Sequence, residues 1–284
     1  MKVLIVPNYA RADALEDAGA LERWLCSEGF DVVWIPDDRI ASSEGIDLSD
    51  CVLAVSLGGD GTLLRAARTI GYGGVPIVGI SYGHLGFLTC AMPDRLFETV
   101  TDALAGDLHA SRRATLDVRA TFDAPDGTSV VERTMALNDC ALSHGDMGDV
   151  ISFDVSVSGN HIDRLRGDGF VVSTATGSTG YALAAGGPIV TPEFGGMVCV
   201  PVAPHTIMAR AFLTSPQDVV EITIDPERPV ATRLFADGRP LGRGASLTHV
   251  SCRRGEGDII LLDYRAQSFY GSVSRVFYGK AADK

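Results

Sequence analysis

The sequence predicts an α+β protein made of an N-terminal α/β domain with a parallel sheet and a C-terminal β-rich, sandwich-like domain. Three observations lead to this fold class. Strand-like and helix-like segments alternate through the N-terminal part, which is typical of a parallel sheet covered by helices. Further along, short segments of alternating apolar and polar residues are separated by turn residues, as in antiparallel sandwiches. The length of 284 residues also suits two domains of roughly 150 residues each.

The first domain is predicted from apolar runs and from apolar residues at helical spacing. The apolar runs predict strands over Lys2–Pro7, Phe30–Pro36, Cys51–Leu57 and Pro76–Ser81. Helical spacing predicts helices over Asp13–Glu28, Thr62–Ile70 and Pro93–Ala105. Parallel sheets bind ligands beyond the carboxyl ends of their strands, so the residues just after Leu57 are candidates for a site.

The second domain is predicted from short strands between turns. These strands are expected at Thr115–Phe122, Val130–Leu142, Ile151–Val157, Val219–Ile224, Thr232–Phe235, Leu247–Cys252 and Asp258–Asp263. We therefore expect domains over residues 1–110 and 111–264. The tail, 265–284, contains the apolar segment Phe269–Tyr278 and is expected to dock back on the first domain.

Charge and cysteine usage exclude several classes of protein. The formal net charge is −12, which argues against binding to duplex nucleic acid or to an anionic membrane, because both require basic surfaces. The six cysteines form no Cys-x-x-Cys pair, and no apolar run reaches the ~18 residues of a membrane span. The N-terminus reads as a strand rather than a signal peptide. These features predict a cytoplasmic protein without nucleic-acid or membrane partners.

The segment Ser56–Leu64, with the sequence SLGGDGTLL, is the most informative in the chain. A buried strand leads into a glycine turn and then a helix, an arrangement in which backbone N–H groups can approach a phosphate closely. Asp60 lies inside the turn, where its charge would repel a phosphate. We interpret it as a residue that takes a proton from a hydroxyl or holds a metal. A glycine turn that serves only tight packing is the alternative.

Two further segments carry polar groups that suit a nucleotide. The segment 173–188, STATGSTGYALAAGGP, has five Ser and Thr hydroxyls that could contact ribose and phosphate, and Ser178 or Thr179 could cap a helix over about 179–185. Ordinary helix capping is the alternative. The pair Asn138-Asp139 interrupts an apolar strand and could grip ribose hydroxyls or an adenine edge, although such a pair also often marks a turn.

Taken together, these motifs resemble the NAD kinase family. The resemblance covers Lys2 to about Tyr264 and also includes the segment 83–88, GHLGFL. The glycine turn is shared with diacylglycerol-type lipid kinases and phosphofructokinases, whereas the segment 173–188 is more specific to NAD kinases. The resemblance implies an α/β domain plus a β-rich domain, and a transfer of the terminal phosphoryl group of ATP to the 2′-hydroxyl of the adenosine ribose of NAD.

The resemblance assigns roles in the first domain. Asp60 would be the base that accepts the proton of the 2′-hydroxyl. ATP or its phosphates would be bound by Gly58, Gly59, Gly61, Thr62 and Arg65, although Arg65 could equally be an exposed helix residue. The divalent cation, most simply Mg²⁺, would arrive with the nucleotide phosphates. No residue is assigned as a metal ligand, because the histidines lack ligand spacing.

The resemblance also implies a NAD site in the cleft between the domains. Its residues would be Asp60, Gly61, His84, Phe87, Asn138, Asp139, Arg166, Asp168, Thr176, Thr179, Tyr181, Ala182 and Ala184. In family members this pocket can draw on a neighbouring subunit, so a homodimer or homotetramer is implied.

The chain departs from the family pattern at positions that bear on affinity. Asp139 replaces the usual Glu, Ser81 stands where many members have Asn, and Arg239 occupies a position often held by Gln. Two other functions stay open at this stage. One is a lipid or sugar kinase that shares only the Gly-Gly-Asp-Gly turn. The other is a sensor that binds NAD(P) without catalysis and would tolerate the substitution Asp60→Asn.

Overall fold

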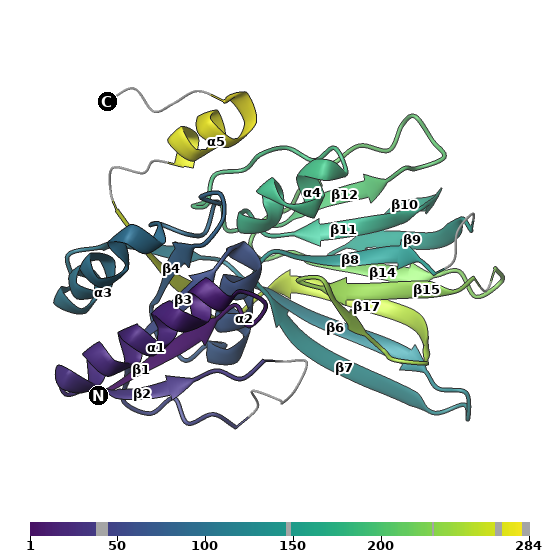
Figure 1. Cartoon of the computed structure of the whole chain (residues 1–284). Helices are drawn as coiled ribbons and strands as arrows, with labels where there is room; N and C mark the ends of the chain where they lie inside the picture. Colours follow the sequence, from purple (N-terminus) through teal and green to yellow (C-terminus); the bar gives the residue numbers. More distant parts are fainter. Residues whose placement is uncertain (38–44, 146–148, 229, 265–268, 280–284) are drawn as a thin grey trace. The chain divides into compact units, whose positions relative to one another are not determined.

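The computed structural model describes residues 1–37, 45–145, 149–228, 230–264 and 269–279 (Figure 1). The chain divides into two compact units. The first contains Met1–Arg112 together with Ile259–Lys284, and the second contains Arg113–Asp258. Each unit has its own sheet system and its own apolar core.

The first unit is an α/β layer structure. Its strands are β1 (Lys2–Pro7), β2 (Asp31–Trp34), β3 (Cys51–Gly58), β4 (Ile77–Ser81), β5 (His109–Arg113) and β18 (Ile259–Asp263). Its helices are α1 (Ala12–Ser27), α2 (Asp60–Ile70), the 3₁₀ turn η1 (Pro93–Arg95), α3 (Leu96–Ala105) and α5 (Phe269–Tyr278).

Helices cover both faces of the first sheet. The strand order is β2-β1-β3-β4-β18-β5, and the pairs of β1 with β2, β1 with β3, and β3 with β4 are parallel. Buried residues of α1 and α3 share one apolar cluster with alternate residues of β1, β3 and β4. Leu63 of α2 lies outside that cluster and contacts the backbone of β4 at Gly79, on the opposite face. The predicted parallel sheet is confirmed.

Helix α2 and strand β18 differ from the sequence-based expectation, and strand β5 is not among the expected strands. Helix α2 begins at Asp60 rather than Thr62, because the N–H groups of Thr62 and Leu63 both donate to the carbonyl of Gly59. Strand β18, expected in the β-rich half, pairs in parallel with β4 through Leu261 and Leu262. Its apolar residues suit a sheet buried on both faces, a property that a short run in isolation does not reveal.

The second unit is built almost entirely from strands. They are β6 (Leu116–Asp123), β7 (Ser129–Ala136), β8 (Asp139–His144), β9 (Ile151–Val157), β10 (Asn160–Gly167), β11 (Gly169–Ser173), β12 (Val198–Val202), β13 (Phe212–Leu213), β14 (Val219–Ile224), β15 (Thr232–Ala236), β16 (Arg239–Leu241) and β17 (Ser246–Arg254). Its short helical pieces are η2 (Thr176–Thr179) and α4 (Tyr181–Ala184).

The strands form two antiparallel sheets that share one core. One sheet has the order β10-β9-β14-β17-β6-β7, and the other has the order β13-β12-β11-β8-β15-β16. Inward side chains of both sheets, including Phe153 and Phe170, form a single buried cluster. The second sheet buries its other face beneath the segment that contains η2 and α4, where Ala182 packs against Val171 and Val200. The predicted sandwich is therefore confirmed, and it has an additional covering layer.

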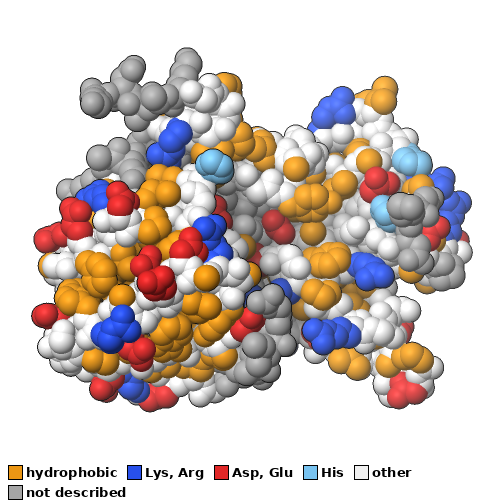
Figure 2. Space-filling view, viewed as in Figure 1, with side chains coloured by type: hydrophobic (Ala, Val, Ile, Leu, Met, Phe, Trp, Pro, Cys, Tyr) orange, Lys and Arg blue, Asp and Glu red, His pale blue; other side chains and the backbone are white. Residues whose placement is uncertain are grey.

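The described part of the tail packs within the first unit. The ring of Phe87 lies 5.6 Å from that of Phe277 and 6.3 Å from that of Phe269, both in α5. The remaining tail residues, 265–268 and 280–284, lie outside the described residues. No helix in the described ranges is long and apolar enough to cross a membrane. On the face of the first unit seen in Figure 2, acidic and basic side chains are interspersed.

Candidate functional site

Strand β3 ends in a turn that brings a carboxylate to the carboxyl edge of the first sheet. Gly58 is the last residue of the strand, Gly59 precedes the helix, and Asp60 is the first residue of α2. A Cβ on Gly58 would lie 2.2 Å from Oγ1 of Thr62 and 3.1 Å from Cβ of Asn8, so no side chain fits there. A Cβ on Gly59 or Gly61 would meet no atom within 4 Å, so there is open space beside the backbone for a ligand. A helix N-terminus at this edge favours anions.

The carboxylate of Asp60 is held by a second loop. The N–H of Phe87 donates to Oδ2 at 3.2 Å, and the N–H of Leu88 donates to Oδ1 at 3.3 Å. The loop approaches so closely that a Cβ on Gly86 would lie 2.3 Å from Oδ1 and 2.5 Å from Oδ2. Both segments carry motifs recognisable in the sequence, and the structure brings them together.

Burial makes Asp60 a stronger proton acceptor than an exposed aspartate. Desolvation raises the pKa of Asp60 above its ordinary value, and the amide groups of Phe87, Leu88 and Thr89 oppose that rise. The two carboxylate oxygens have about four lone-pair sites, more than these amides occupy. The group can therefore accept a proton from a hydroxyl while the loop fixes its orientation.

The other residues predicted in the first unit differ in accessibility. Gly61 and His84 are exposed, and Thr62 is half-buried. The carbonyl of His84 accepts a hydrogen bond from Oγ of Ser81 at 2.8 Å, which shapes the loop. Arg65 donates to the carbonyl of Pro7 at 2.5 Å, and its guanidinium lies 5.3 Å from the ring centroid of Tyr9. Arg65 therefore packs against the end of β1.

In the second unit, Asn138 and Asp139 lie beside the hydroxyl-rich segment. Strands β8 and β11 pair so that Asp139 is opposite Ser173. The carbonyl of Asn138 accepts hydrogen bonds from the N–H of Thr174 and from Oγ of Ser173. Oδ1 of Asn138 is buried and has no hydrogen-bond partner among the described residues. Such an acceptor costs about 1–3 kcal/mol unless a ligand donor reaches it.

Most hydroxyls of the segment 173–188 serve the fold itself. Oγ1 of Thr174 donates to the carbonyl of Leu137 at 2.6 Å, and Oγ of Ser178 donates to the carbonyl of Ala175 at 2.6 Å. The expected cap by Ser178 or Thr179 is wrong, because α4 begins at Tyr181 after Gly180 and no side chain caps it. The hydroxyls of Ser173, Thr174 and Ser178 all donate to carbonyls of the protein, so fewer hydroxyls are available to a ligand than the sequence suggested.

The remaining predicted residues of this segment vary in burial. Thr176 and Ala182 are buried, Thr179 is half-buried, and Tyr181 and Ala184 are exposed. Oγ1 of Thr179 donates to the carbonyl of Thr176 at 3.2 Å. The exposed ring of Tyr181 follows Gly180, whose Cβ position lies 3.9 Å from Nδ2 of Asn138. Tyr181 therefore directly follows a residue that lies beside the side-chain amide of Asn138.

Asp237, for which the sequence predicts no role, organises this neighbourhood. Its carboxylate accepts hydrogen bonds from the backbone N–H groups of Leu137 at 2.8 Å, Asn138 at 2.7 Å and Asp139 at 3.2 Å. Asp237 adopts a left-handed conformation with φ of 46°, which is uncommon outside glycine, although Asp and Asn tolerate it. The adjacent Gly238 was the only sequence signal of a turn here.

Asp139 faces this second carboxylate in a buried position. Burial raises the pKa of Asp139 to about 7, and the charge of Asp237 adds to the rise. The folded pKa exceeds the unfolded value, so the native state binds more protons between about pH 4 and 7. The contribution of Asp139 to stability therefore falls as the pH rises through that window, and it levels off above the folded pKa.

This linkage gives a stability prediction for Asp139→Asn. At pH 4, the lower end of that window, the variant should have nearly the wild-type free energy of unfolding, because Asp139 is protonated in the native state and only partly ionised in the unfolded state. At pH 8 the variant should be more stable than the wild type by roughly 2–4 kcal/mol, since it removes a buried charge. Urea unfolding at the two pH values measures the difference, and equal differences at both pH values would contradict the assignment.

Arg166 and Asp168 lie at the far end of β11 from Asn138 and Asp139. Gly169 at the start of β11 pairs with Ser143, whereas Ser173 at its end pairs with Asp139. Five strand residues span about 17 Å at ~3.4 Å each. Arg166 is exposed, and Asp168 is half-buried. Within a single chain, Arg166 and Asp168 therefore do not lie next to Asn138 and Asp139.

The described residues include no group of three or more His, Cys, Asp or Glu side chains arranged to hold a metal ion. The donor set at the glycine turn is a single carboxylate, which is too few for a protein cage of a divalent cation. We therefore derive no step through a protein-bound metal.

Sequence comparisons match both halves of the chain. Residues 38–108 match the ATP-NAD kinase N-terminal domain, and residues 137–256 match the ATP-NAD kinase C-terminal domain. The chain is 32% identical to the NAD kinase of Aromatoleum aromaticum, an alignment that covers 99% of this chain and 95% of the relative. It is 37% identical to the NAD kinase of Azoarcus sp., with 84% and 82% covered.

Solved structures of similar fold complete the comparison. The yeast NADH kinase complexed with NADH has a TM-score of 0.84 at 21% identity, covering 100% of this chain and 89% of that one. An NAD kinase from Archaeoglobus fulgidus in complex with ATP has a TM-score of 0.74 at 26% identity, with 93% and 94% covered. The matches extend over both units, which a kinase that shares only the glycine turn would not explain.

Proposed function

Because the chain belongs to the NAD kinase family and phosphorylates NAD with ATP to give NADP, we propose that Asp60 is the general base of this reaction. The observation that carries the proposal is the half-buried carboxylate at the carboxyl edge of the first sheet, fixed by the amides of Phe87 and Leu88. A base held in this way is already oriented before the substrate arrives, which reduces the entropic cost of the reaction.

The proposed step is a direct phosphoryl transfer. The 2′-oxygen of the adenosine ribose forms a bond to the terminal phosphorus of ATP while the bond from that phosphorus to the ADP oxygen breaks. The hydroxyl proton passes to the carboxylate of Asp60, and ADP leaves with the bonding electrons. Gly59 and Gly61 have open space beside their backbone at a helix N-terminus, which supports binding of the phosphates there, and the close packing of Gly58 fixes the turn that presents them. Thr62, one residue further, lies in the same first turn of α2.

We assign dinucleotide recognition in the second unit to Asn138, Asp139 and the segment 176–184. The unpaired Oδ1 of Asn138 supports this assignment, because a ribose hydroxyl or the adenine amino group would satisfy it. Tyr181 presents an exposed ring suited to stacking on a base.

We propose that the working enzyme is a homo-oligomer, a dimer or a tetramer. The supporting observation is the distance along β11 that separates Arg166 and Asp168 from Asn138. This separation favours a site in which a second subunit supplies one of the two sets to the NAD molecule. We place the enzyme in the cytoplasm, since all six cysteines are free. Mg²⁺ is proposed to enter bound to the phosphates of ATP.

The direct test is the formation of NADP from NAD and ATP by the purified chain. Stoichiometric production of NADP and ADP, followed by chromatography, is the expected result. A protein that binds NAD but forms neither product would be a sensor, which would overturn the catalytic proposal.

We further propose that Asp237 positions the Asn138-Asp139 segment, and Asp237→Ala tests this role. The variant loses the acceptor of three backbone N–H groups, so its free energy of unfolding should fall by about 2–4 kcal/mol. The KM for NAD should rise about tenfold, with a smaller change in kcat. Steady-state kinetics and urea unfolding measure both effects.

Two variants separate positioning from backbone strain. Asp237→Asn keeps an acceptor oxygen and tolerates the left-handed conformation, so it should recover much of the NAD affinity. Asp50 also has a positive φ, 59°, on the surface of the first unit. The substitution Asp50→Ala should therefore reproduce the strain and leave the KM unchanged. An unchanged KM in Asp237→Ala would contradict the positioning role.

A further inference from the structure

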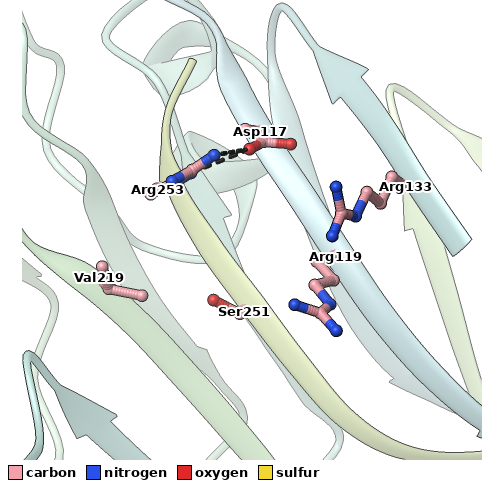
Figure 3. A pocket seen from close by; sticks show the side chains of 6 residues that line it. All are labelled: Asp117, Arg119, Arg133, Val219, Ser251 and Arg253. Carbon is pink, nitrogen blue, oxygen red and sulfur yellow. Dashed lines mark hydrogen bonds and ion pairs between the residues drawn. The ribbon is translucent and has the colours of Figure 1, made fainter. Parts of the chain in front are cut away.

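The outer face of the sheet β10-β9-β14-β17-β6-β7 carries a pocket that none of the NAD or ATP residues lines. The pocket has a volume of about 270 Å³ and is lined by Asp117, Arg119, Arg133, Val219, Ser251 and Arg253 (Figure 3). These residues come from four adjacent strands, β14, β17, β6 and β7. They alternate with core residues such as Val118 and Cys252, so the pocket lies on the side of the sheet away from the core.

Two arginines of this pocket lie directly opposite each other. Arg119 on β6 pairs in register with Arg133 on β7, an arrangement in which side chains are about 5 Å apart at Cβ and like charges repel. Among the described residues, neither guanidinium has an ion pair or hydrogen bond. Both side chains are exposed, and Figure 3 shows them on the same side of the sheet.

Neither Arg119 nor Arg133 has a carboxylate partner among the residues that line the pocket. The net charge is −12, and other arginines, such as Arg95 with Glu98 and Arg164 with Asp154, form ion pairs. In the pocket, the one lining carboxylate, Asp117, is bound by Arg253 through two nitrogens at 2.9 and 2.7 Å. That pair leaves the charges of Arg119 and Arg133 uncompensated. An acidic protein that keeps two opposed, unpaired guanidiniums retains a local attraction for anions.

We propose that this pocket is a binding site for a phosphate-class anion, with Arg119 and Arg133 as its principal ligands. Guanidinium groups bind phosphoryl oxygens bidentately. Ser251, which pairs with Arg119 across β6 and β17, offers a hydroxyl next to them. The volume lies just below the ~300–1,000 Å³ of sites for drug-sized ligands. The pocket therefore suits an inorganic phosphate or diphosphate, or the phosphate chain of a nucleotide, rather than a whole dinucleotide.

Calorimetric titration with inorganic pyrophosphate tests the site. Arg119→Ala and Arg133→Ala should each weaken one class of pyrophosphate binding by about tenfold or more, because each removes a charge-assisted contact. Arg164→Ala is the matched control, since it removes an exposed arginine from the same sheet, outside the pocket. It should leave binding unchanged. Titration with ADP distinguishes a nucleotide ligand from inorganic phosphate or diphosphate. If the pocket binds the phosphate chain of a nucleotide, the Arg119 and Arg133 variants should lose one ADP site per chain.

The variant Arg133→Glu tests the same site through the thermal midpoint of unfolding. Arg133→Glu would place opposite charges across the two strands, so its thermal midpoint without multivalent anions should be at least that of the wild type. Pyrophosphate should raise the thermal midpoint of the wild type. The part of this rise that comes from binding in the pocket should be absent in Arg133→Glu. Equal shifts in all variants, or an equal shift from sodium chloride at matched ionic strength, would overturn the site. A change of oligomeric state without any loss of pyrophosphate binding would also overturn it, in favour of a subunit interface.

Discussion

Asp60→Asn is expected to lower kcat by about 10²–10⁴-fold, the range that general base catalysis contributes. The amide has nearly the shape of the carboxylate but cannot accept the hydroxyl proton. One of the amides of Phe87 and Leu88 would still find an acceptor oxygen, so the loop should stay in place. NAD binding should persist, and the thermal midpoint should change little. Steady-state formation of NADP and equilibrium binding of NAD measure the two effects separately.

The matched control for this variant is Asp13→Asn. Asp13 is also an aspartate in the first turn of a helix, but it is exposed and pairs with Arg11. Its substitution should leave kcat within about twofold of the wild type, because surface ion pairs contribute little. If Asp60→Asn turned over as fast as this control, another group would have to be the base. Loss of NAD binding together with turnover would instead assign Asp60 a role in binding alone.

The pH dependence of the wild type bears on the same assignment. Because burial raises the pKa of Asp60, activity should fall on the acid side at a pH above the ordinary range of an aspartate. Bound substrates change the surroundings of the carboxylate, so kcat/KM, which reports the free enzyme, is the appropriate profile. The acid limb should vanish from the residual activity of Asp60→Asn.

The parts of the fold that depend on local patterns could be predicted from the sequence. The alternation of apolar runs and helical spacing located α1, α3 and the first parallel strands, because burial imposes those periods directly. The glycine turn and Asp60 were recognised for the same reason, since a strand, a glycine turn and a helix are contiguous in the chain. In contrast, β18 was assigned to the wrong sheet, because its partner β4 lies far away in sequence.

The contacts that build the candidate site were less predictable. The sequence offered the hydroxyls of Ser173, Thr174 and Ser178 as ligand contacts, yet each satisfies a backbone carbonyl of the fold. Buried polar groups must find partners, and an isolated sequence does not indicate whether a partner comes from the protein or from a ligand. Asp237 was missed for a related reason. Its three acceptor contacts reach residues about a hundred positions away in the chain.

Gly86→Ala is expected to lower kcat by about 10²-fold while the protein remains folded. A Cβ at this position would lie 2.3 Å from Oδ1 of Asp60 and 2.6 Å from its Cγ. Either the carboxylate must rotate or the loop must withdraw, and both movements break the hydrogen bonds from Phe87 and Leu88. A displacement of about 1 Å at a reacting group can cost ~10²-fold in rate. The overpacking should also lower the free energy of unfolding by about 1–3 kcal/mol.

Gly83→Ala in the same loop distinguishes this steric mechanism from a general loss of loop flexibility. A Cβ on Gly83 meets no atom within 4 Å, and Gly83 does not have the positive φ that disfavours alanine. The two variants reduce the conformational freedom of the unfolded loop equally, so only the contact with Asp60 differs. Gly83→Ala should retain wild-type kcat and stability within about 1 kcal/mol. Equal losses of kcat in both variants would show that the loop acts through its mobility, and the close approach of Gly86 to the carboxylate would then not explain the catalytic geometry.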